Sequence, residues 1–266
     1  IANPIPIRVV SKLIGFQDED PDQLLQVAFT STAMLAATGP LEHQLSAMET
    51  SMDAVGWIVG QVDTAINGAP ADGILDVVAK AVNAGDLEAT DAFSVMATLL
   101  SAGGESTTSL LGNALHHLAS HPELQAQVRQ DSEAVTPFIE EMLRLESPFR
   151  YHLRHAPAAT DLRGVEIPTG AAVLLLWGAA NRDPAEFDRP DEVVLDRVAP
   201  RHHLGFGRGI HLCVGAPLAR LEASVILGEV LQRTAHFDLD PDDPPMREHS
   251  LVVRRFARLP LRITAA

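Results

Sequence analysis

The chain has a single cysteine among its 266 residues, so no disulfide can form within it. This fits a reducing compartment, and we expect a cytoplasmic protein. Basic residues are also few, because 20 Lys and Arg stand against 35 Asp and Glu, giving a formal net charge of -15. A protein that binds nucleic acid over a broad surface needs a basic face. The composition therefore argues against nucleic acid as a partner.

Long apolar runs are absent as well. No run approaches the roughly 20 apolar residues that a membrane-spanning helix needs, so we expect no membrane span. The longest candidate is AAVLLLWGAA at 171–180, which is bounded by Gly170 and Asn181 and is typical of a buried strand. Aromatic residues make up only 5% of the chain, so the core must consist mainly of Leu, Val and Ala.

The first two thirds of the sequence is predicted to be helical. Apolar residues recur at helical spacing in 21–37, 44–65, 73–84, 91–119, 122–130 and 136–146. Short stretches rich in Pro, Gly and Asp separate these segments. In the last segment, Thr136 is the predicted N-cap and Pro137 the predicted first helical residue.

The remainder has a different character. Strands are predicted at 150–156 and 171–177, and a closing hairpin at 251–264. The segment 181–203 is rich in Pro and Asp and has no clear period, and loops of this length are usually functional or disordered. We see no internal repeat or linker. We therefore expect a single domain over residues 1–266, mainly α with small β elements.

The lone cysteine, Cys213, lies in the glycine-rich stretch FGRGIHLCVG, just before a helix predicted at about 215–233. A helix N-terminus presents unpaired N–H groups and a positive dipole end, so a thiol placed there tends to ionise. The glycines permit close approaches that a side chain would block. Such a thiolate can be a nucleophile, a redox sensor or a metal ligand. The alternative is a buried structural cysteine.

Zinc is one possible metal, because His202, His203 and His211 lie near the cysteine. Structural zinc sites prefer paired spacings such as C-x-x-C or H-x-x-x-H. His211 and Cys213 are two residues apart on a glycine-flanked turn, and the sequence has no second pair. The spacing therefore argues against zinc.

The longer stretch FGRGIHLCVGAPLAR resembles the haem-binding signature of the cytochrome P450 family. The matching residues are Phe206, Gly207, Gly209, His211, Cys213, Gly215, Leu218, Ala219 and Arg220. The resemblance implies that Cys213 is the axial thiolate ligand of the iron in haem b. It also implies that Phe206 shields the thiolate and that the glycines leave room for a flat macrocycle.

A second match is EEMLR, in which Glu141 and Arg144 are three residues apart and share a helical face. Taken alone, such a pair is usually a surface ion pair worth little. With the cysteine loop downstream, it resembles the Glu-x-x-Arg motif of the same family. The resemblance implies a buried, structural pair that is joined by an arginine from the long loop, and Arg197 fits that position.

A third match is LLSAGGESTTSLL, where two adjacent glycines fall inside a predicted helix. Each costs about 1 kcal/mol relative to alanine, which helices tolerate for close packing or for a ligand near the backbone. The stretch resembles the family's motif on the distal side of the haem. Ala102 and Gly103 are then implied to border the oxygen site, and Glu105 and Ser106 to deliver protons. The family usually has threonine where this chain has Ser106.

Further roles follow from the resemblance alone. Three basic residues are implied as partners of the haem propionates: Arg154, His203 and His211. Propionates bind best to charge-assisted donors, which these side chains supply. The alternative for each is an ordinary surface side chain. The implied substrate-pocket residues are Pro148, Phe149 and Arg150.

The resemblance runs from Ile1 to the C-terminus and implies a cytochrome P450 fold lacking its N-terminal portion, with a native gene product that begins earlier. The implied activity is that of a haem-thiolate monooxygenase, which inserts one oxygen atom from O2 into a small hydrophobic organic substrate. Because no flavin or nicotinamide motif is present, electrons are expected from a ferredoxin and its ferredoxin reductase, docking near Arg201, Arg208 and Arg220. The alternative is a truncated, non-catalytic relative that acts as a binding or regulatory partner.

Overall fold

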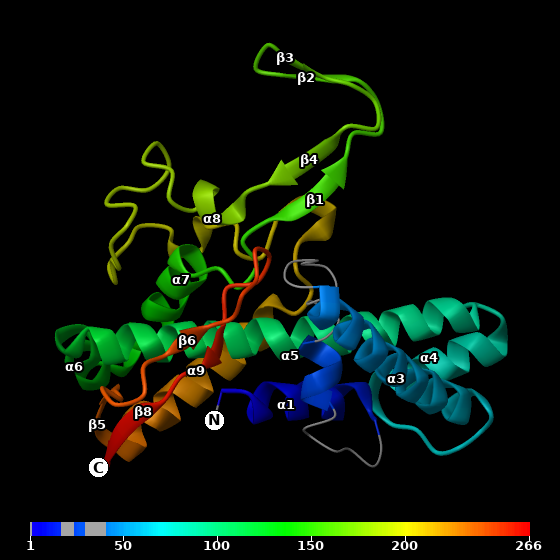
Figure 1. Ribbon diagram of the computed structural model, residues 1–266, viewed down its shortest axis with the longest axis horizontal. Helices are drawn as coiled ribbons and strands as arrows, with labels where there is room; N and C mark the ends of the chain where they lie inside the picture. The colour runs from blue at the N-terminus through cyan, green and yellow to red at the C-terminus, as the bar shows by residue number, and fades with distance from the viewer. Residues whose placement is uncertain (1, 17–23, 30–40) are drawn as a thin grey trace.

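The computed structural model describes residues 2–16, 24–29 and 41–266. Its helices are α1 (Pro4–Ile14), α3 (Leu41–Ile66), α4 (Gly73–Ala84), α5 (Ala89–Ser120), α6 (Pro122–Gln130), α7 (Val135–Leu145), α8 (Trp177–Ala180) and α9 (Ala216–Arg233). The helix predicted at 21–37 lies mostly outside the described residues. Figure 1 shows α5 running along the long axis, with α1, α3 and α4 packed on one half and α6, α7 and α9 on the other.

The strands of the described residues form four small antiparallel pairs. These are β1 (His152–His155) with β4 (Ala172–Leu175), β2 (Thr160–Leu162) with β3 (Val165–Ile167), β5 (Thr234–Leu239) with β8 (Leu261–Ala265), and β6 (Met246–Arg247) with β7 (Phe256–Arg258). The mainly helical fold with small β elements is confirmed.

Two predictions about the β elements are wrong. The hairpin predicted at 251–264 does not form, because β7 and β8 pair with β6 and β5 instead of with each other. The stretch 171–180 is not one buried strand. It divides into β4, whose residues are exposed or half-buried, and the short helix α8. Periodicity describes one segment at a time and contains no information about which distant strand pairs with it.

Helix α1 is absent from the predicted helices, and α7 begins earlier than predicted. Prolines at the first turn of α1 are compatible with a helix, and Ile7, Val10 and Ile14 lie on its buried face. Helix α7 begins at Val135, directly after a 3-10 turn at Ser132–Ala134. The predicted N-cap at Thr136 is therefore wrong.

The hydrophobic core consists of two clusters of buried side chains. One joins α1, α3 and α4 to the first half of α5, through residues such as Met96 and Leu100. The other joins α7, α9 and β5 to the second half of α5, through residues such as Leu111 and Phe138. Because α5 contributes to both clusters, it joins the two halves of the fold. Gly103 and Gly104 lie on α5 between the residues of the first cluster and those of the second.

These glycines allow α1 to cross α5 closely. A Cβ on Gly103 would lie 2.6 Å from Cγ2 of Val10, and a Cβ on Gly104 would lie 2.6 Å from Cδ1 of Ile7. Such distances are too short for carbon atoms in van der Waals contact. Close helix packing therefore accounts for both glycines, and Gly103 also lies at the cavity described next.

Candidate functional site

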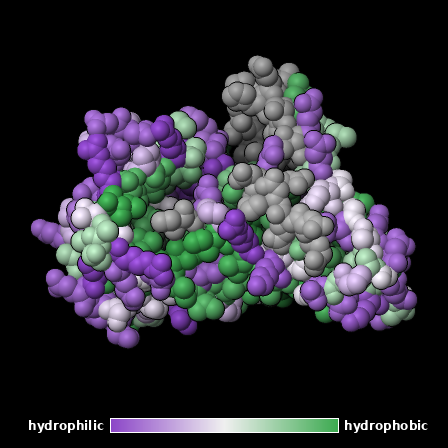
Figure 2. Space-filling view, turned by 90° about the horizontal axis from the view of Figure 1, so that it is seen from below, coloured by the Kyte–Doolittle hydropathy of each residue, from purple (hydrophilic) through white to green (hydrophobic). Residues whose placement is uncertain are grey.

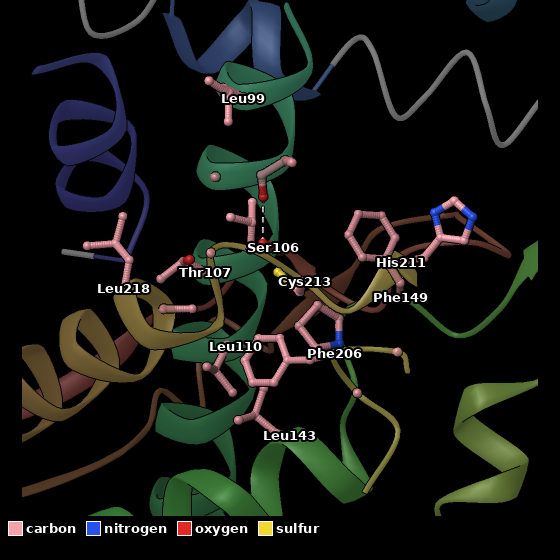
Figure 3. A pocket seen from close by; sticks show the side chains of 18 of the residues that line it. Leu99, Ser106, Thr107, Leu110, Leu143, Phe149, Phe206, His211, Cys213 and Leu218 are labelled. Carbon is pink, nitrogen blue, oxygen red and sulfur yellow. Dashed lines mark hydrogen bonds between the residues drawn. The ribbon is translucent and has the colours of Figure 1, made fainter. Parts of the chain in front are cut away.

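A cavity of about 510 Å³ lies between α5, the start of α9, β1 and the loop that carries the cysteine. Most of its wall is apolar, and Figure 3 shows Phe149, Phe206, His211 and Cys213 around it. Eleven of the predicted site residues line it: Ala102, Gly103, Ser106, Pro148, Phe149, Arg154, Phe206, Gly207, His211, Cys213 and Gly215. Segments far apart in the sequence thus meet at one place.

The cysteine loop is held by its own backbone. The N–H of Cys213 donates to the carbonyl oxygen of Phe206 at 2.9 Å. Gly207 and Gly209 have φ angles of 69° and 71°, in the left-handed region that favours glycine. The side chain of Cys213 is exposed at the cavity, and α9 begins three residues later at Ala216. The loop therefore presents an accessible thiol ahead of a helix N-terminus.

The two residues predicted as a proton-delivery pair point in different directions. Ser106 lines the cavity, and its Oγ donates to the carbonyl oxygen of Ala102 at 2.6 Å. Glu105 is buried and is not among the described residues that line the cavity. Its Oε1 accepts from Nε of Arg255 at 2.8 Å. The structure places only the hydroxyl of the predicted pair at the cavity.

Glu141, Arg144 and Arg197 form a cluster, and none of them is among the described residues that line the cavity. Both carboxylate oxygens of Glu141 accept from Arg144, at 2.8 and 2.9 Å, and from Arg197, at 2.8 and 3.1 Å. Glu141 and Arg144 are fully buried. Burial raises the pKa of Glu141, but these hydrogen bonds outweigh it, so the pKa lies below its ordinary value. The cluster anchors the long loop to α7.

His203, which the resemblance implies as a propionate partner, is not among the described residues that line the cavity. It is buried, its Nε2 lies 2.9 Å from Oε2 of Glu140, and its Nδ1 accepts from the N–H of Gly205 at 3.1 Å. Both ring nitrogens are therefore engaged within the fold. Arg150 and Gly209 are likewise not among the described residues that line the cavity.

Glu140 also engages two of the arginines expected to dock a redox partner. Arg220 donates to it at 2.6 Å, and a nitrogen of Arg201 lies 3.5 Å away. Burial raises the pKa of Glu140, but hydrogen bonds from His203 and Arg220 outweigh burial and lower it to about 2. Glu140 therefore stays ionised and offsets part of the positive charge of Arg201 and Arg220.

Sequence reasoning missed the pair His152 and Trp177, which lines the cavity beside Arg154. Nε1 of Trp177 lies 2.6 Å from Nδ1 of His152. An indole N–H can only donate, so Nδ1 is the acceptor. Burial and the nearby Arg154 lower the pKa of His152. The neutral ring then carries its proton on Nε2, which is available to donate.

Glu222 on α9 is the second missed residue. It is buried in the wall of the cavity, and burial raises its pKa to about 7. A signal was present in the sequence, because this acid stands among apolar residues in LARLEASVIL. Periodicity could not show that it faces a cavity.

Replacing Glu222 with glutamine should flatten the pH dependence of stability. The pKa in the folded chain is about 7 against an ordinary value of 4.5. The folded state therefore binds the proton more tightly, and its stability is intact below pH 4.5 and falls as the pH rises through 7. The wild type should lose up to about 3 kcal/mol over this interval, whereas Glu222→Gln should not.

Urea unfolding at pH 5 and pH 8 measures this difference. Glu229→Gln is the matched control, because Glu229 lies on the same helix with its side chain 51% exposed. An equal loss of stability in the wild type and in Glu222→Gln would contradict the prediction.

The described residues contain no group of three or more His, Cys, Asp or Glu side chains arranged to hold a metal ion. Within the same residues, none of the helices has both the length and the apolar character needed to span a membrane.

Both the sequence and the fold of this chain are similar to those of known proteins. The sequence profile described as "Cytochrome P450" matches residues 59–263. Cytochrome P450 144 of Mycobacterium tuberculosis is 43% identical over 263 residues, which are 99% of this chain and 60% of that protein. The 6-deoxyerythronolide B hydroxylase of Saccharopolyspora erythraea is 33% identical over 266 residues, 98% of this chain and 64% of that protein.

Solved cytochrome P450 structures also superpose closely on this chain. Cytochrome P450 CREJ in complex with (4-ethylphenyl) dihydrogen phosphate superposes with a TM-score of 0.93 at 28% identity, covering 99% of this chain and 66% of that one. P450BioI in complex with an acyl carrier protein gives 0.89 at 30% identity, covering 99% and 67%. The chain thus spans about three fifths to two thirds of the length of these proteins. It belongs to the cytochrome P450 family.

Proposed function

We propose that the protein is a haem-thiolate monooxygenase that binds haem b in this cavity. The observation that carries the proposal is the exposed Cys213 thiol on a loop that borders an apolar cavity, with the hydroxyl of Ser106 in the same cavity. When bound, haem would supply the activation of O2, and one oxygen atom would enter an organic substrate. Cys213 would hold the haem iron through its thiolate.

The residues that line the cavity fit a haem group. The wall is mostly apolar, as the faces of a macrocycle require, and the cavity also holds cationic or hydrogen-bonding side chains from Arg154, Arg208 and His211. These suit two carboxylates, because charge-assisted hydrogen bonds are the strong ones. Gly207 supplies a backbone of positive φ without a side chain. We therefore assign propionate binding to these three side chains and leave His203 out.

Ser106 is proposed to pass protons toward the oxygen site. Its Oγ now donates to the carbonyl oxygen of Ala102. A hydroxyl both donates and accepts, so it can turn from this carbonyl toward a bound group. Serine lacks the branch methyl that restricts threonine, so its side chain changes rotamer more freely.

The substrate is proposed to be small, organic and mainly hydrophobic. Pro148 and Phe149 line the cavity together with Leu99 and Leu110, whereas Arg150 does not. The Nε2–H of His152 is a donor that would orient a carbonyl or hydroxyl oxygen of the substrate. We therefore expect oxygen-bearing hydrophobic compounds to bind more tightly than hydrocarbons of the same size.

Electrons are proposed to come from a ferredoxin and its reductase, with the protein in the cytoplasm. A docking face on the cysteine side is supported by exposed arginines, Arg201 and Arg208, next to Ile210 and Val214, which are 96% and 87% exposed. An acidic partner would complement the arginines. Figure 2 shows that hydrophobic side chains also gather on the face of the molecule seen from below the view of Figure 1.

The test is an absorption spectrum of the purified protein after haem is added, then reduced and exposed to carbon monoxide. We expect the Soret band typical of thiolate-ligated haem. No haem band, together with an obligate complex in size exclusion, would instead favour a non-catalytic relative that acts as a partner. A haem band without thiolate character would contradict Cys213 as the ligand.

A further inference from the structure

We propose that four arginines outside the cavity bind a phosphate group, either as inorganic phosphate or as part of a small phosphate ester. The arginines are Arg150, Arg182, Arg247 and Arg254, and they are called the arginine cluster below. None of them is among the described residues that line the cavity. The phosphate site is therefore separate from the haem site, and it can be tested without haem.

Three members of the arginine cluster share one carboxylate, that of Glu146 at the end of α7. Nη2 of Arg254 lies 3.0 Å from Oε1 of Glu146. Nη2 of Arg247 lies 3.6 Å from its Oε2, and Nη2 of Arg182 lies 3.9 Å from its Oε1. A carboxylate carries one negative charge, so it cannot neutralise three guanidinium groups.

The other partners of these arginines leave most of the surplus charge in place. Arg182 also donates to Oδ1 of Asp191 at 2.5 Å, and this carboxylate offsets one further charge. Arg247 has neutral partners: its Nη1 donates to Oδ1 of Asn113 at 2.5 Å, and its guanidinium lies 3.7 Å from the ring centroid of Phe256. Four arginines against two carboxylates leave two positive charges without a counter-charge.

Arg150 is brought to this place by backbone pairing between distant segments. The N–H of Arg150 donates to the carbonyl oxygen of Val252, and the N–H of Arg254 donates to that of Pro148, both at 2.8 Å. Arg150 is half-buried. Within the part of the chain that the structure describes, its guanidinium makes no hydrogen bond and no ion pair. A half-buried charge without a partner is unfavourable, so its place in a basic cluster calls for an anion.

The like charges also act on one another. Burial lowers the pKa of Arg247, and repulsion from Arg254 and Arg150 lowers it further, against the attraction of Glu146, to about 10. Arg247 is still charged at neutral pH. An anion bound among these arginines would relieve the repulsion.

A phosphate group matches the arginine cluster in charge, shape and access. It carries about -1.5 to -2 charges near pH 7, close to the surplus of two positive charges. The planar guanidinium donates two parallel hydrogen bonds to phosphate oxygens. The side chains of Arg182, Arg247 and Arg254 are 35%, 34% and 31% exposed, so a solute can reach them. Figure 1 shows β6 and β7, which carry or adjoin two of these arginines, lying across α5.

Phosphorus NMR titrations of the purified chain test the site, one with inorganic phosphate and one with methyl phosphate. The ionic strength is held constant with sodium chloride, because screening changes weak ionic binding. We expect saturable binding of one phosphate group per chain. Tighter binding of inorganic phosphate would identify the free ion as the ligand, and tighter binding of methyl phosphate would identify an ester. Unsaturable binding, or none, of both compounds would overturn the proposal.

Variants connect the binding to the arginine cluster. Arg150→Gln should weaken phosphate binding by about tenfold or more, because hydrogen bonds between charged groups are the strong ones. Its fold should survive, since the guanidinium of Arg150 has no partner within the described residues. Arg233→Gln, which changes an exposed arginine on α9, should bind phosphate like the wild type. Equal affinity in the wild type and Arg150→Gln would overturn the proposal.

A change of opposite sign provides an independent measurement. Asp191 competes with phosphate for Arg182, and its side chain is 76% exposed, so Asp191→Asn should fold normally. We expect this variant to bind phosphate about two- to fivefold more tightly, the range that loss of an exposed ion pair allows. Unchanged or weaker binding in Asp191→Asn would show that Arg182 takes no part in the site and would contradict the four-arginine cluster.

Discussion

Cys213→Ser should abolish the thiolate-haem band of the reduced, carbon monoxide-bound protein and lower monooxygenase activity to background. A serine hydroxyl is a far weaker ligand than a thiolate for this kind of iron centre, and the structure describes no second cysteine that could replace it. The fold should survive, because the side chain of Cys213 is exposed and the loop is held by the backbone bond to Phe206.

The absorption spectrum and a thermal unfolding curve, recorded on the same sample, separate ligand loss from misfolding. Val214→Ala is the matched control, since Val214 is the next residue and is 87% exposed. We expect this control to keep the band. A thiolate-type band that persists in Cys213→Ser would show that another residue binds the iron, and the proposed role of Cys213 would then be wrong.

Arg144→Met should lower the free energy of unfolding by about 3–5 kcal/mol, the usual cost of breaking a buried ion pair. Arg144 is fully buried, and it donates to both oxygens of Glu141. It also donates to the carbonyl oxygens of Asn181, Pro190 and Glu192 in the long loop, at 3.0, 2.5 and 2.8 Å. Methionine fills similar space but cannot donate, so the carbonyl oxygens of Asn181 and Pro190 lose this donor and Glu141 keeps only one of its two arginines, Arg197.

Urea unfolding at neutral pH measures this loss. The control is Arg233→Met, which breaks an exposed pair with Glu229 on α9 and should cost less than about 1 kcal/mol. The double variant Glu141→Gln with Arg144→Met should lose less stability than the sum of the two single variants. Each single change leaves a buried charge without its partner, whereas the double variant removes both charges of the pair. A loss in Arg144→Met as small as in the control would contradict a structural role for the cluster.

Local signals in the sequence were enough to predict most helices and the family. Helices α4, α5 and α6 lie close to the predicted ranges, since each has its own apolar period and punctuation. The cysteine loop and the Glu-x-x-Arg pair are contiguous motifs whose spacing can be read without a fold. Helix ends were less predictable: a 3-10 turn at Ser132–Ala134, capped by the side chain of Asp131, continues directly into α7.

The sequence by itself determined the long helices, the small β content, the family and the cysteine that defines the site. Only the tertiary structure decided that Ser106 faces the cavity while its neighbour Glu105 pairs with Arg255, 150 residues away. It also decided that His203 binds Glu140 and that Glu222 lies in the cavity wall. The physical reason is that periodicity and motifs record contacts between near neighbours in the chain. The orientation and charge of a buried side chain depend on partners that folding brings from distant segments.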